Sequence, residues 1–303
     1  MLNPEVSVVI PTYNRPQKLL RAVDSVINQS YQDLEIIVVD DYPGEDNQDL
    51  LPTYGPLRYI QHNKNRGAPI ARNNGILAAQ GKYIALLDDD DEWKPQKLEC
   101  QIERFNKLSD NFGLVYSGRD IVRRGEIIKT YIPKHEGKVY STLLQKNIIP
   151  SETPLIRREC FGVIGLFDPR FKSSQDWDLW LRIASEYKVA TVTKSLAISH
   201  ESHKRRISTD MNRKYQGHKQ LLEKHKSAFE SHPAALAQLE RQLGIFATQS
   251  GRNLEGFNYL LSAYSYDPSD WPILLYLIMS VTPNPVREWL FNIRSEAIRR
   301  LFE

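Results

Sequence analysis

The chain has 303 residues, of which 41% are hydrophobic and 25% are charged, and its formal net charge is +3. This length suffices for one large domain, or for one domain with an appendage, and the composition excludes a disordered or fibrous protein. A net charge this small gives no reason to expect a nucleic-acid partner.

The cysteines and the apolar segments indicate a cellular location. Cys100 and Cys160 lie far apart and lack metal-type spacing, which indicates free thiols in a reducing compartment. The N-terminus runs directly into a predicted strand and has no basic segment followed by a long apolar one, as a secretory signal would. The longest apolar stretch, Ile273 to Val281, is too short to span a bilayer. The expected location is therefore the cytoplasm.

The first hundred residues alternate between predicted strands and helices. Val6 to Ile10 forms a strand, and the following turn leads into a helix that Asn14 caps and Pro16 begins. Further strands are predicted at 34–39, 57–60 and 83–87, and further helices at 69–80 and 95–108. This order predicts an α/β fold with a mostly parallel sheet and right-handed crossovers.

The pattern is looser after residue 113. An edge strand is predicted at 127–131, an amphipathic helix at 176–186 and a last strand at 189–192. Residues 151–156 are predicted to be extended, with Pro154 keeping them away from the centre of a sheet. Beyond about residue 211 the chain is predicted to be all helical, so we expect a catalytic domain at 1–210 and a helical region at 211–303.

Three features of the helical region allow more than one interpretation. Between Lys204 and Lys226 there are eight basic and two acidic residues, which form either a solvated helix face, a clamp over diphosphate or a contact with an anionic membrane. Six residues fall at the spacing of a single tetratricopeptide-like helical hairpin: Leu243, Gly244, Gly251, Ala263, Asp267 and Pro268. The segment after Trp289 mixes apolar and arginine residues, which suits docking on the core or resting at a membrane interface.

Four consecutive carboxylates, Asp88 to Asp91, follow the apolar strand that ends at Leu87. Two unit charges 4 Å apart repel by about 1 kcal/mol even in water, so the cluster calls for a compensating cation. Oxygen ligands favour a hard divalent ion such as Mg²⁺ or Mn²⁺, which uses one or two carboxylates together with substrate phosphates. The alternative is an acidic surface turn.

Three other segments should converge on this strand end, because ligands of open α/β sheets bind beyond the carboxyl ends of the strands. They are the turn at 11–14, the Asp40–Asp41 pair and residues 67–76. Tyr13 can stack on a ring, a carboxylate can accept a hydrogen bond from a base, and Arg72 can lie near phosphate. Together these groups predict a nucleotide site.

These segments resemble the inverting family 2 glycosyltransferases. The resemblance covers residues 5 to about 210 and rests on Ser7 to Arg15, Glu35 to Asp41, Gly67 to Ile76, Leu86 to Trp93 and Gln175 to Arg182. It implies a GT-A fold and a nucleotide-sugar donor, commonly UDP-linked. It also implies Mn²⁺ or Mg²⁺ as cofactor, and a role in making cell-surface polysaccharide or lipopolysaccharide.

The resemblance also implies roles for single residues. A nucleotide-binding set comprises Pro11, Thr12, Tyr13, Asn14, Asp41, Arg72, Asp88 and Asp89, in which Thr12, Tyr13 and Asp41 hold the base. Asp90 binds the metal, and His203 fits a metal-binding histidine better than His200 does. Asp176 matches the catalytic base. Gln175 stands where members usually have Glu, which removes one neighbouring negative charge.

The implied chemistry is a single displacement. Asp176 takes a proton from an acceptor hydroxyl, which attacks the opposite face of the anomeric carbon and inverts it. The acceptor is expected to be a saccharide or a lipid-linked saccharide, and peripheral contact with the inner face of the cell membrane is a further hypothesis.

Two other functions compete with this one. A sugar-phosphate nucleotidyltransferase would need a glycine-rich phosphate loop after the first strand, and residues 11–15 contain no glycine. A non-catalytic nucleotide-sugar sensor or scaffold would use the helical hairpin for interaction, but it would not need both Asp90 and Asp176.

Overall fold

The computed structural model describes residues 3–44, 47–201, 210–270 and 272–282. By internal contacts the chain forms two compact units. The first comprises Met1–Leu143, Asn147–Arg170 and Gln175–Lys204, and the second Leu144–Lys146, Phe171–Ser174 and Arg205–Glu303. The sequence-based boundary at residue 210 stays a prediction.

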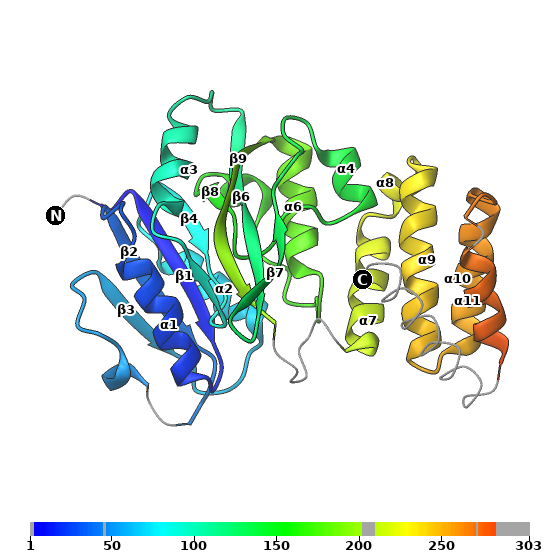
Figure 1. Cartoon of the computed structure of the whole chain (residues 1–303), viewed down its shortest axis with the longest axis horizontal. Helices are drawn as coiled ribbons and strands as arrows, with labels where there is room; N and C mark the ends of the chain where they lie inside the picture. The colour runs from blue at the N-terminus through cyan, green and yellow to red at the C-terminus, as the bar shows by residue number, and fades with distance from the viewer. Residues whose placement is uncertain (1–2, 45–46, 202–209, 271, 283–303) are drawn as a thin grey trace. The chain divides into compact units, whose positions relative to one another are not determined.

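One sheet of nine strands forms the centre of the first unit (Figure 1). Its order is β3-β2-β1-β4-β8-β6-β9-β5, and β7 pairs with β6. The strands are β1 Val6–Thr12, β2 Leu34–Asp40, β3 Leu57–Gln61, β4 Tyr83–Leu86, β5 Asp91–Trp93, β6 Phe112–Arg123, β7 Glu126–Tyr131, β8 Leu155–Arg157 and β9 Lys188–His200.

The sheet combines a parallel half with antiparallel additions. Strands β3, β2, β1 and β4 are parallel, as the alternation of the first hundred residues predicts, and β6 and β9 are also parallel. Strand β8 runs antiparallel between β4 and β6 and joins these two groups. The expectation that Pro154 excludes this segment from the centre is wrong, because Pro154 precedes the first residue of the strand and no ladder N–H is lost.

Helices cover both faces of the parallel half (Figure 1). Helix α1 (Pro16–Ile27) buries Leu19 and Val23 in the same core cluster as Val8 and Ile10 of β1. Helix α2 (Ala68–Ala78) packs on the opposite face, since Gly75 lies against Val9, and alternate strand residues point to opposite faces. A Cβ at Gly75 would lie 2.3 Å from Val9 Cγ1, so only glycine permits this approach.

The start of α1 differs in part from the prediction. Pro16 is in the first turn as predicted, but the residue at the N-cap position is Arg15 and not Asn14. Asn14 has a φ of 50°, in the left-handed region.

The remaining helices complete the described chain. The short ones are the 3-10 helix η1 Gln48–Leu50, α4 Tyr140–Gln145, α5 Cys160–Ile164 and α8 Lys226–Glu230. The longer ones are α3 Lys97–Phe105, α6 Gln175–Glu186, α7 Met211–Lys224, α9 Pro233–Gln249, α10 Asn253–Tyr266 and α11 Pro272–Val281.

The second unit is helical, as predicted. Helices α9 and α10 pack closely through Gly244 and Gly256, and a Cβ at Gly244 would lie 2.5 Å from Leu260 Cγ. Leu260, Ala263 and Ile273 belong to a small core of this unit's own. The segment after Trp289 lies outside the described residues.

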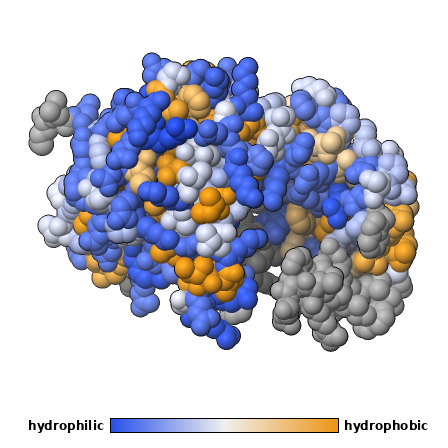
Figure 2. Space-filling model, turned by 45° about the horizontal axis from the view of Figure 1, so that its top comes forward, coloured by the Kyte–Doolittle hydropathy of each residue, from blue (hydrophilic) through white to orange (hydrophobic). Residues whose placement is uncertain are grey.

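None of the helices in the described ranges combines the length and the apolar character that a membrane crossing needs. On the face shown in Figure 2 hydrophilic surface predominates, interrupted by a few separate hydrophobic patches.

Candidate active site

The carboxyl ends of β1, β2 and β4 lie along one rim of the sheet. Thr12 pairs with Asp40 across β1 and β2, and Val9 pairs with Leu86 across β1 and β4. This register brings the turn after β1, Asp41 after β2 and the acidic residues after β4 to the same edge, as the sequence predicts.

Asp89 is held from two directions at this rim. Thr12 Oγ1 donates to Asp89 Oδ2 at 2.8 Å, and Arg15 Nη1 lies 3.0 Å from Oδ1. Burial raises the pKa of Asp89 to about 6, although Arg15 and Thr12 oppose the rise. Thr12 is itself 5% exposed, so its hydroxyl is committed to positioning this carboxylate.

Asp88 pairs with Arg72 of α2. Arg72 Nη2 donates to Asp88 Oδ1 at 2.5 Å, and Ser151 Oγ donates to Oδ2 at 3.2 Å. Burial opposes ionisation of Asp88, but the Arg72 guanidinium outweighs it and lowers the pKa. The second terminal nitrogen of Arg72, Nη1, is buried and has no hydrogen-bond partner among the described residues. A buried donor without a partner is costly, and a phosphate oxygen would satisfy it.

Asp90 has a partly exposed carboxylate that can hold a metal together with phosphate. Its side chain is 17% exposed and lies 3.4 Å from Lys18 Nζ and 3.5 Å from Arg15 Nη1. Over the described residues no group of three or more His, Cys, Asp or Glu side chains forms a metal cage. The donor set therefore fits an ion held by one or two carboxylates plus a ligand's phosphates, the usual arrangement for Mg²⁺.

The charge compensation at this rim also comes from the protein's own cations. Arg15, Lys18 and Arg72 lie against these aspartates, so the charge cluster by itself does not require a metal. The pattern of the acidic stretch could not predict these three partners, because they come from other segments of the chain.

Asp91 differs from its three neighbours. It is the first residue of β5 and is 8% exposed. Burial and then the neighbouring Glu152 raise its pKa well above the ordinary range. Glu152 is 1% exposed, pairs with Arg119 at 2.8 Å and accepts from Ser199 Oγ at 2.5 Å. Asp91 and Glu152 thus lie in a buried network behind the rim, and Glu152 is committed to Arg119.

The Asp41 carboxylate is surrounded by hydrogen-bond donors. Its Oδ1 accepts from the Arg66 amide at 2.8 Å and contacts His62 Nδ1 at 2.7 Å, while Oδ2 accepts from the Gly67 amide at 2.7 Å. Asn74 Nδ2 lies 2.8 Å from His62 Nε2. The neighbouring Asp40 is fully buried and binds Tyr42, Asn47 and Tyr59, which is a structural role.

Tyr13 is the accessible aromatic side chain of the turn after β1. It is 44% exposed and meets the Tyr42 ring edge-on, with centroids 5.4 Å apart. Pro11 is a buried residue of β1, and Asn14 follows Tyr13 in the left-handed conformation. A ring that is 44% exposed keeps part of its surface available for stacking.

Asp176 lies in the first turn of α6 and is held by Asn147. Asn147 Nδ2 donates to Asp176 Oδ2 at 3.0 Å, and the Ile149 amide donates to Asn147 Oδ1 at 3.3 Å, which orients the amide. Burial raises the pKa of Asp176, although hydrogen bonds from the Trp177 amide and Asn147 and the charge of Arg72 oppose the rise. Burial thus outweighs the hydrogen bonds at the start of the helix, and the raised pKa makes the carboxylate a stronger base.

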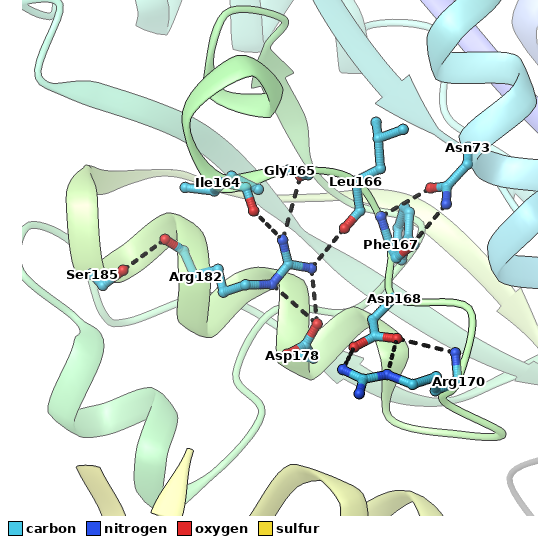
Figure 3. Close-up of polar contacts among 10 residues, drawn as sticks. All are labelled: Asn73, Ile164, Gly165, Leu166, Phe167, Asp168, Arg170, Asp178, Arg182 and Ser185. Carbon is cyan, nitrogen blue, oxygen red and sulfur yellow. Dashed lines mark hydrogen bonds and ion pairs between the residues drawn. The ribbon is translucent and has the colours of Figure 1, made fainter. Parts of the chain in front are cut away.

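Helix α6 is fixed along its length. Trp177 Nε1 donates to Leu143 O at 2.6 Å, and Trp180 Nε1 donates to Ile149 O at 3.1 Å. Asp178, the other carboxylate in the first turn of α6, is fully buried and pairs with Arg182 at 2.8 Å (Figure 3). A carboxylate committed in this way cannot meet an acceptor hydroxyl.

A short loop joins α6 to α2 (Figure 3). Arg182 donates to the carbonyl oxygens of Ile164 and Leu166 on this loop. Asn73 of α2 both donates to and accepts from the backbone of Phe167, at 2.8 and 2.9 Å. The helix that bears Arg72 and the helix that bears Asp176 are therefore braced by the same five-residue segment, 164–168.

The predicted metal-binding histidine, His203, lies outside the described residues. His200 is described and its Nε2 lies 2.6 Å from Glu92 Oε1, so it is engaged in a contact of its own. Among the residues that sequence reasoning missed are Arg15, Lys18, Asn147 and Ser151, which reach the site from the start of α1 and from the segment before β8.

Comparison with known proteins places the chain in a family. Residues 7–164 match the family model of glycosyl transferase family 2. A protein of Escherichia coli (strain K12) named for colanic acid biosynthesis, the glycosyl transferase WcaA, is 34% identical over 240 residues, which are 75% of this chain and 84% of that protein.

Two solved structures resemble the whole fold. Residues 1–349 of S. aureus TarS, in complex with UDP-GlcNAc, are 18% identical at a TM-score of 0.61, with 97% of this chain and 88% of that chain covered. The mannosyltransferase PcManGT of Pyrobaculum calidifontis, in complex with GDP-Man and Mn²⁺, is 18% identical at a TM-score of 0.55, with 98% and 81% covered. The fold is thus the predicted GT-A α/β fold with C-terminal helices. With the family model matching more than half of its length, the chain is a member of glycosyl transferase family 2.

Proposed function

We propose that this protein is an inverting glycosyltransferase that moves a sugar from a nucleotide-diphosphate donor, a UDP-sugar, to an acceptor hydroxyl during synthesis of a cell-surface polysaccharide or lipopolysaccharide. The observation that carries the proposal is the convergence, at one rim, of Asp88, Asp89 and Arg72 with Asp176, a carboxylate of raised pKa held by Asn147.

Donor binding is assigned to the rim of β1, β2 and β4. Tyr13 has an exposed ring on which the base can stack. Among the described residues Asp41 Oδ2 accepts from the Gly67 amide, and its second lone pair can accept from a base N–H. The partnerless Arg72 Nη1 is placed to donate to a phosphate oxygen. The relative named for colanic acid and the TarS structure with UDP-GlcNAc support a UDP-linked hexose and a polysaccharide product.

The divalent ion is assigned to Asp90, with His203 as the further ligand that the resemblance implies. Mn²⁺ or Mg²⁺ would supply Lewis-acid neutralisation of the diphosphate. The Mn²⁺ in the PcManGT complex supports this assignment. Lys18 and Arg15, which contact Asp90, add positive charge where the diphosphate carries negative charge.

Removal of the acceptor's hydroxyl proton is assigned to Asp176. Its carboxylate accepts the acceptor's hydroxyl proton as that oxygen attacks the anomeric carbon. The bond from that carbon to the diphosphate oxygen breaks and UDP leaves with the bonding electrons, so one displacement inverts the configuration and no second catalytic carboxylate is needed. Asn147 holds the carboxylate by Oδ2, and the amide of Trp177 also hydrogen-bonds to it. The fixed helix α6 keeps this base at a constant position relative to the loop 164–168.

A turnover panel tests the proposal. UDP-sugars are incubated with the protein and Mn²⁺ or Mg²⁺, with wild type compared with Asp176→Asn, and release of UDP is followed with saccharide acceptors. Transfer by wild type that falls by about 10²–10⁴-fold in the variant supports the proposal. Binding of UDP-sugars without any turnover across the panel would instead favour a non-catalytic sensor.

A further inference from the structure

His62, the residue that follows strand β3, lies beside Asp41, the carboxylate to which base binding is assigned. Asp40 pairs with Gln61 across β2 and β3, and the His62 amide extends this ladder by donating to Asp40 O at 2.8 Å. The register therefore brings the next residue of each strand, Asp41 and His62, together. His62 is 6% exposed and Asp41 is 4% exposed, so the polar atoms of both side chains need partners within the protein.

Both ring nitrogens of His62 have a partner. Nδ1 lies 2.7 Å from Asp41 Oδ1, and Nε2 lies 2.8 Å from Asn74 Nδ2 of α2. The amide nitrogen of Asn74 can only donate, so Nε2 accepts, and the single ring proton of the neutral imidazole is on Nδ1. From there it is donated to Asp41. Asn74 thus fixes the tautomer of His62, and this tautomer is the one that can hold the carboxylate.

The contacts of Asp41 leave one acceptor position for a ligand. Each carboxylate oxygen has two lone pairs. Oδ1 accepts from His62 Nδ1 and from the Arg66 amide at 2.8 Å, so both of its lone pairs are used. Oδ2 accepts from the Gly67 amide at 2.7 Å, and over the described residues no second donor reaches it. A ligand donor is therefore directed to Oδ2 and away from Oδ1.

This single position discriminates between nucleobases by their ring nitrogens. Uracil carries N3–H between two carbonyl groups and guanine carries N1–H, so either base can donate to Oδ2. Cytosine has an unprotonated N3, whose lone pair would face the carboxylate. A site built to accept from an N–H group strongly rejects an analogue without one. If Oδ1 were also open, the carboxylate could turn and meet the exocyclic amine of cytosine instead, and the discrimination would weaken.

We propose that His62 and Asn74 are positioning residues for base recognition: by holding Asp41 Oδ1 they leave Oδ2 to the base, and so make the site select a nucleobase that has a ring N–H. The inference rests on the proposed function, because that proposal assigns Asp41 to the base. It also links the two ends of the nucleotide, since Asn74 and Arg72, the proposed phosphate contact, are two residues apart on α2.

Calorimetry with UDP and with CDP, both in the presence of Mg²⁺, tests this selection in the full chain. In His62→Ala we expect the UDP Kd to rise roughly 10- to 100-fold, the cost of losing a hydrogen bond to a charged group, while the CDP Kd changes little. The ratio of the two affinities therefore falls. His62→Asn, whose amide nitrogen can take the place of Nδ1, should recover most of the UDP affinity. His135→Ala, which changes an exposed histidine, should match wild type.

Asn74→Ala keeps the imidazole and removes the group that fixes its tautomer, so it tests the arrangement even if His62→Ala fails to fold. Long-range proton–nitrogen NMR near neutral pH should show one proton on Nδ1 of His62 in wild type, and a share of the Nε2–H tautomer in Asn74→Ala. The UDP affinity of this variant should fall. In turnover assays the donor KM should rise with the Kd while kcat at saturating donor stays unchanged, because His62 does not touch the reacting atoms.

Two outcomes overturn the inference: a wild-type ratio of UDP to CDP affinity in both His62→Ala and Asn74→Ala, or a wild-type His62 ring protonated on Nε2. Failure of the proposed function has a different signature, in which wild type binds UDP but transfers no sugar from any UDP-sugar. The binding and NMR measurements need no turnover, so they decide the inference in that case as well.

Discussion

Replacing Asn147 with alanine should move the acid side of the pH profile of kcat/KM to higher pH. Asn147 donates to the Asp176 carboxylate at 3.0 Å, and a hydrogen bond to a charged group contributes about 1.5–3 kcal/mol. Since 1.36 kcal/mol corresponds to one pKa unit, the pKa that determines the acid limb of the profile should rise by about one unit or more. Burial already raises the pKa of Asp176, and the variant removes one of the interactions that oppose this rise.

The same substitution has a consequence for stability. The pKa of Asp176 is higher in the folded protein than in the unfolded chain, so ionisation of this carboxylate destabilises the fold. The cost is absent below the unfolded pKa, about 3.9, and complete above the folded pKa. Losing Asn147 enlarges the cost, so the difference in Tm between wild type and Asn147→Ala should be larger at pH 7 than at pH 4.

The assay follows initial rates of UDP release from pH 5 to 9, with Asn106→Ala, an exposed asparagine, as the control. In Asn147→Ala the rate at high pH should recover toward wild type, because a deprotonated Asp176 is still present there. An acid limb that does not move, together with an unchanged kcat, would refute the reasoning that Asn147 tunes the base.

Further predictions concern the base, the metal, the α6 anchor and the membrane. Asp176→Asn should keep wild-type UDP binding and stability yet lose transfer by about 10²–10⁴-fold, and wild-type turnover would show that it is not the base. Asp90→Ala should abolish the difference in UDP affinity between Mn²⁺ and chelator, measured by calorimetry; equal wild-type affinities in both conditions would contradict metal dependence. Asp178→Ala should destabilise the fold by about 3 kcal/mol in urea unfolding, because it leaves Arg182 without its buried partner, whereas the exposed Glu103→Ala should change little. The basic segment 204–226 should bind anionic liposomes in flotation assays at low salt, with about 1 kcal/mol for each basic residue near the surface, and binding that ignores salt would argue against it.

The sequence could predict the parallel half of the sheet because its signals are local. Apolar runs end in Asp41 and Asp88, and the topology of alternating strands and helices brings such ends together without further information. The amphipathic pattern also predicted the helix that carries Asp176, and the role of this residue as base stays a prediction.

The parts of the fold and of the candidate site that the sequence could not predict depend on contacts between residues far apart in the chain. Strand β8 has only three residues, and its place between β4 and β6 follows from pairing that no local pattern encodes. The partners of the carboxylates could not be predicted for the same reason, since Asn147 and Asp176 are 29 residues apart and Arg15 and Asp89 are 74 apart. A run of aspartates indicates that its negative charge must be balanced, but it does not indicate which side chains balance it.

The loop 164–168 that braces α2 and α6 limits how this enzyme can diverge. The helices that carry Arg72, the proposed donor contact, and Asp176, the proposed base, are both attached to this short segment, so a change in its length should disturb both groups at once. Strand β7 has no such double role, because its side chains are largely exposed. New acceptor preferences can therefore arise by lengthening or reshaping exposed segments of that kind, while the 164–168 segment keeps the spacing between the two halves of the reaction.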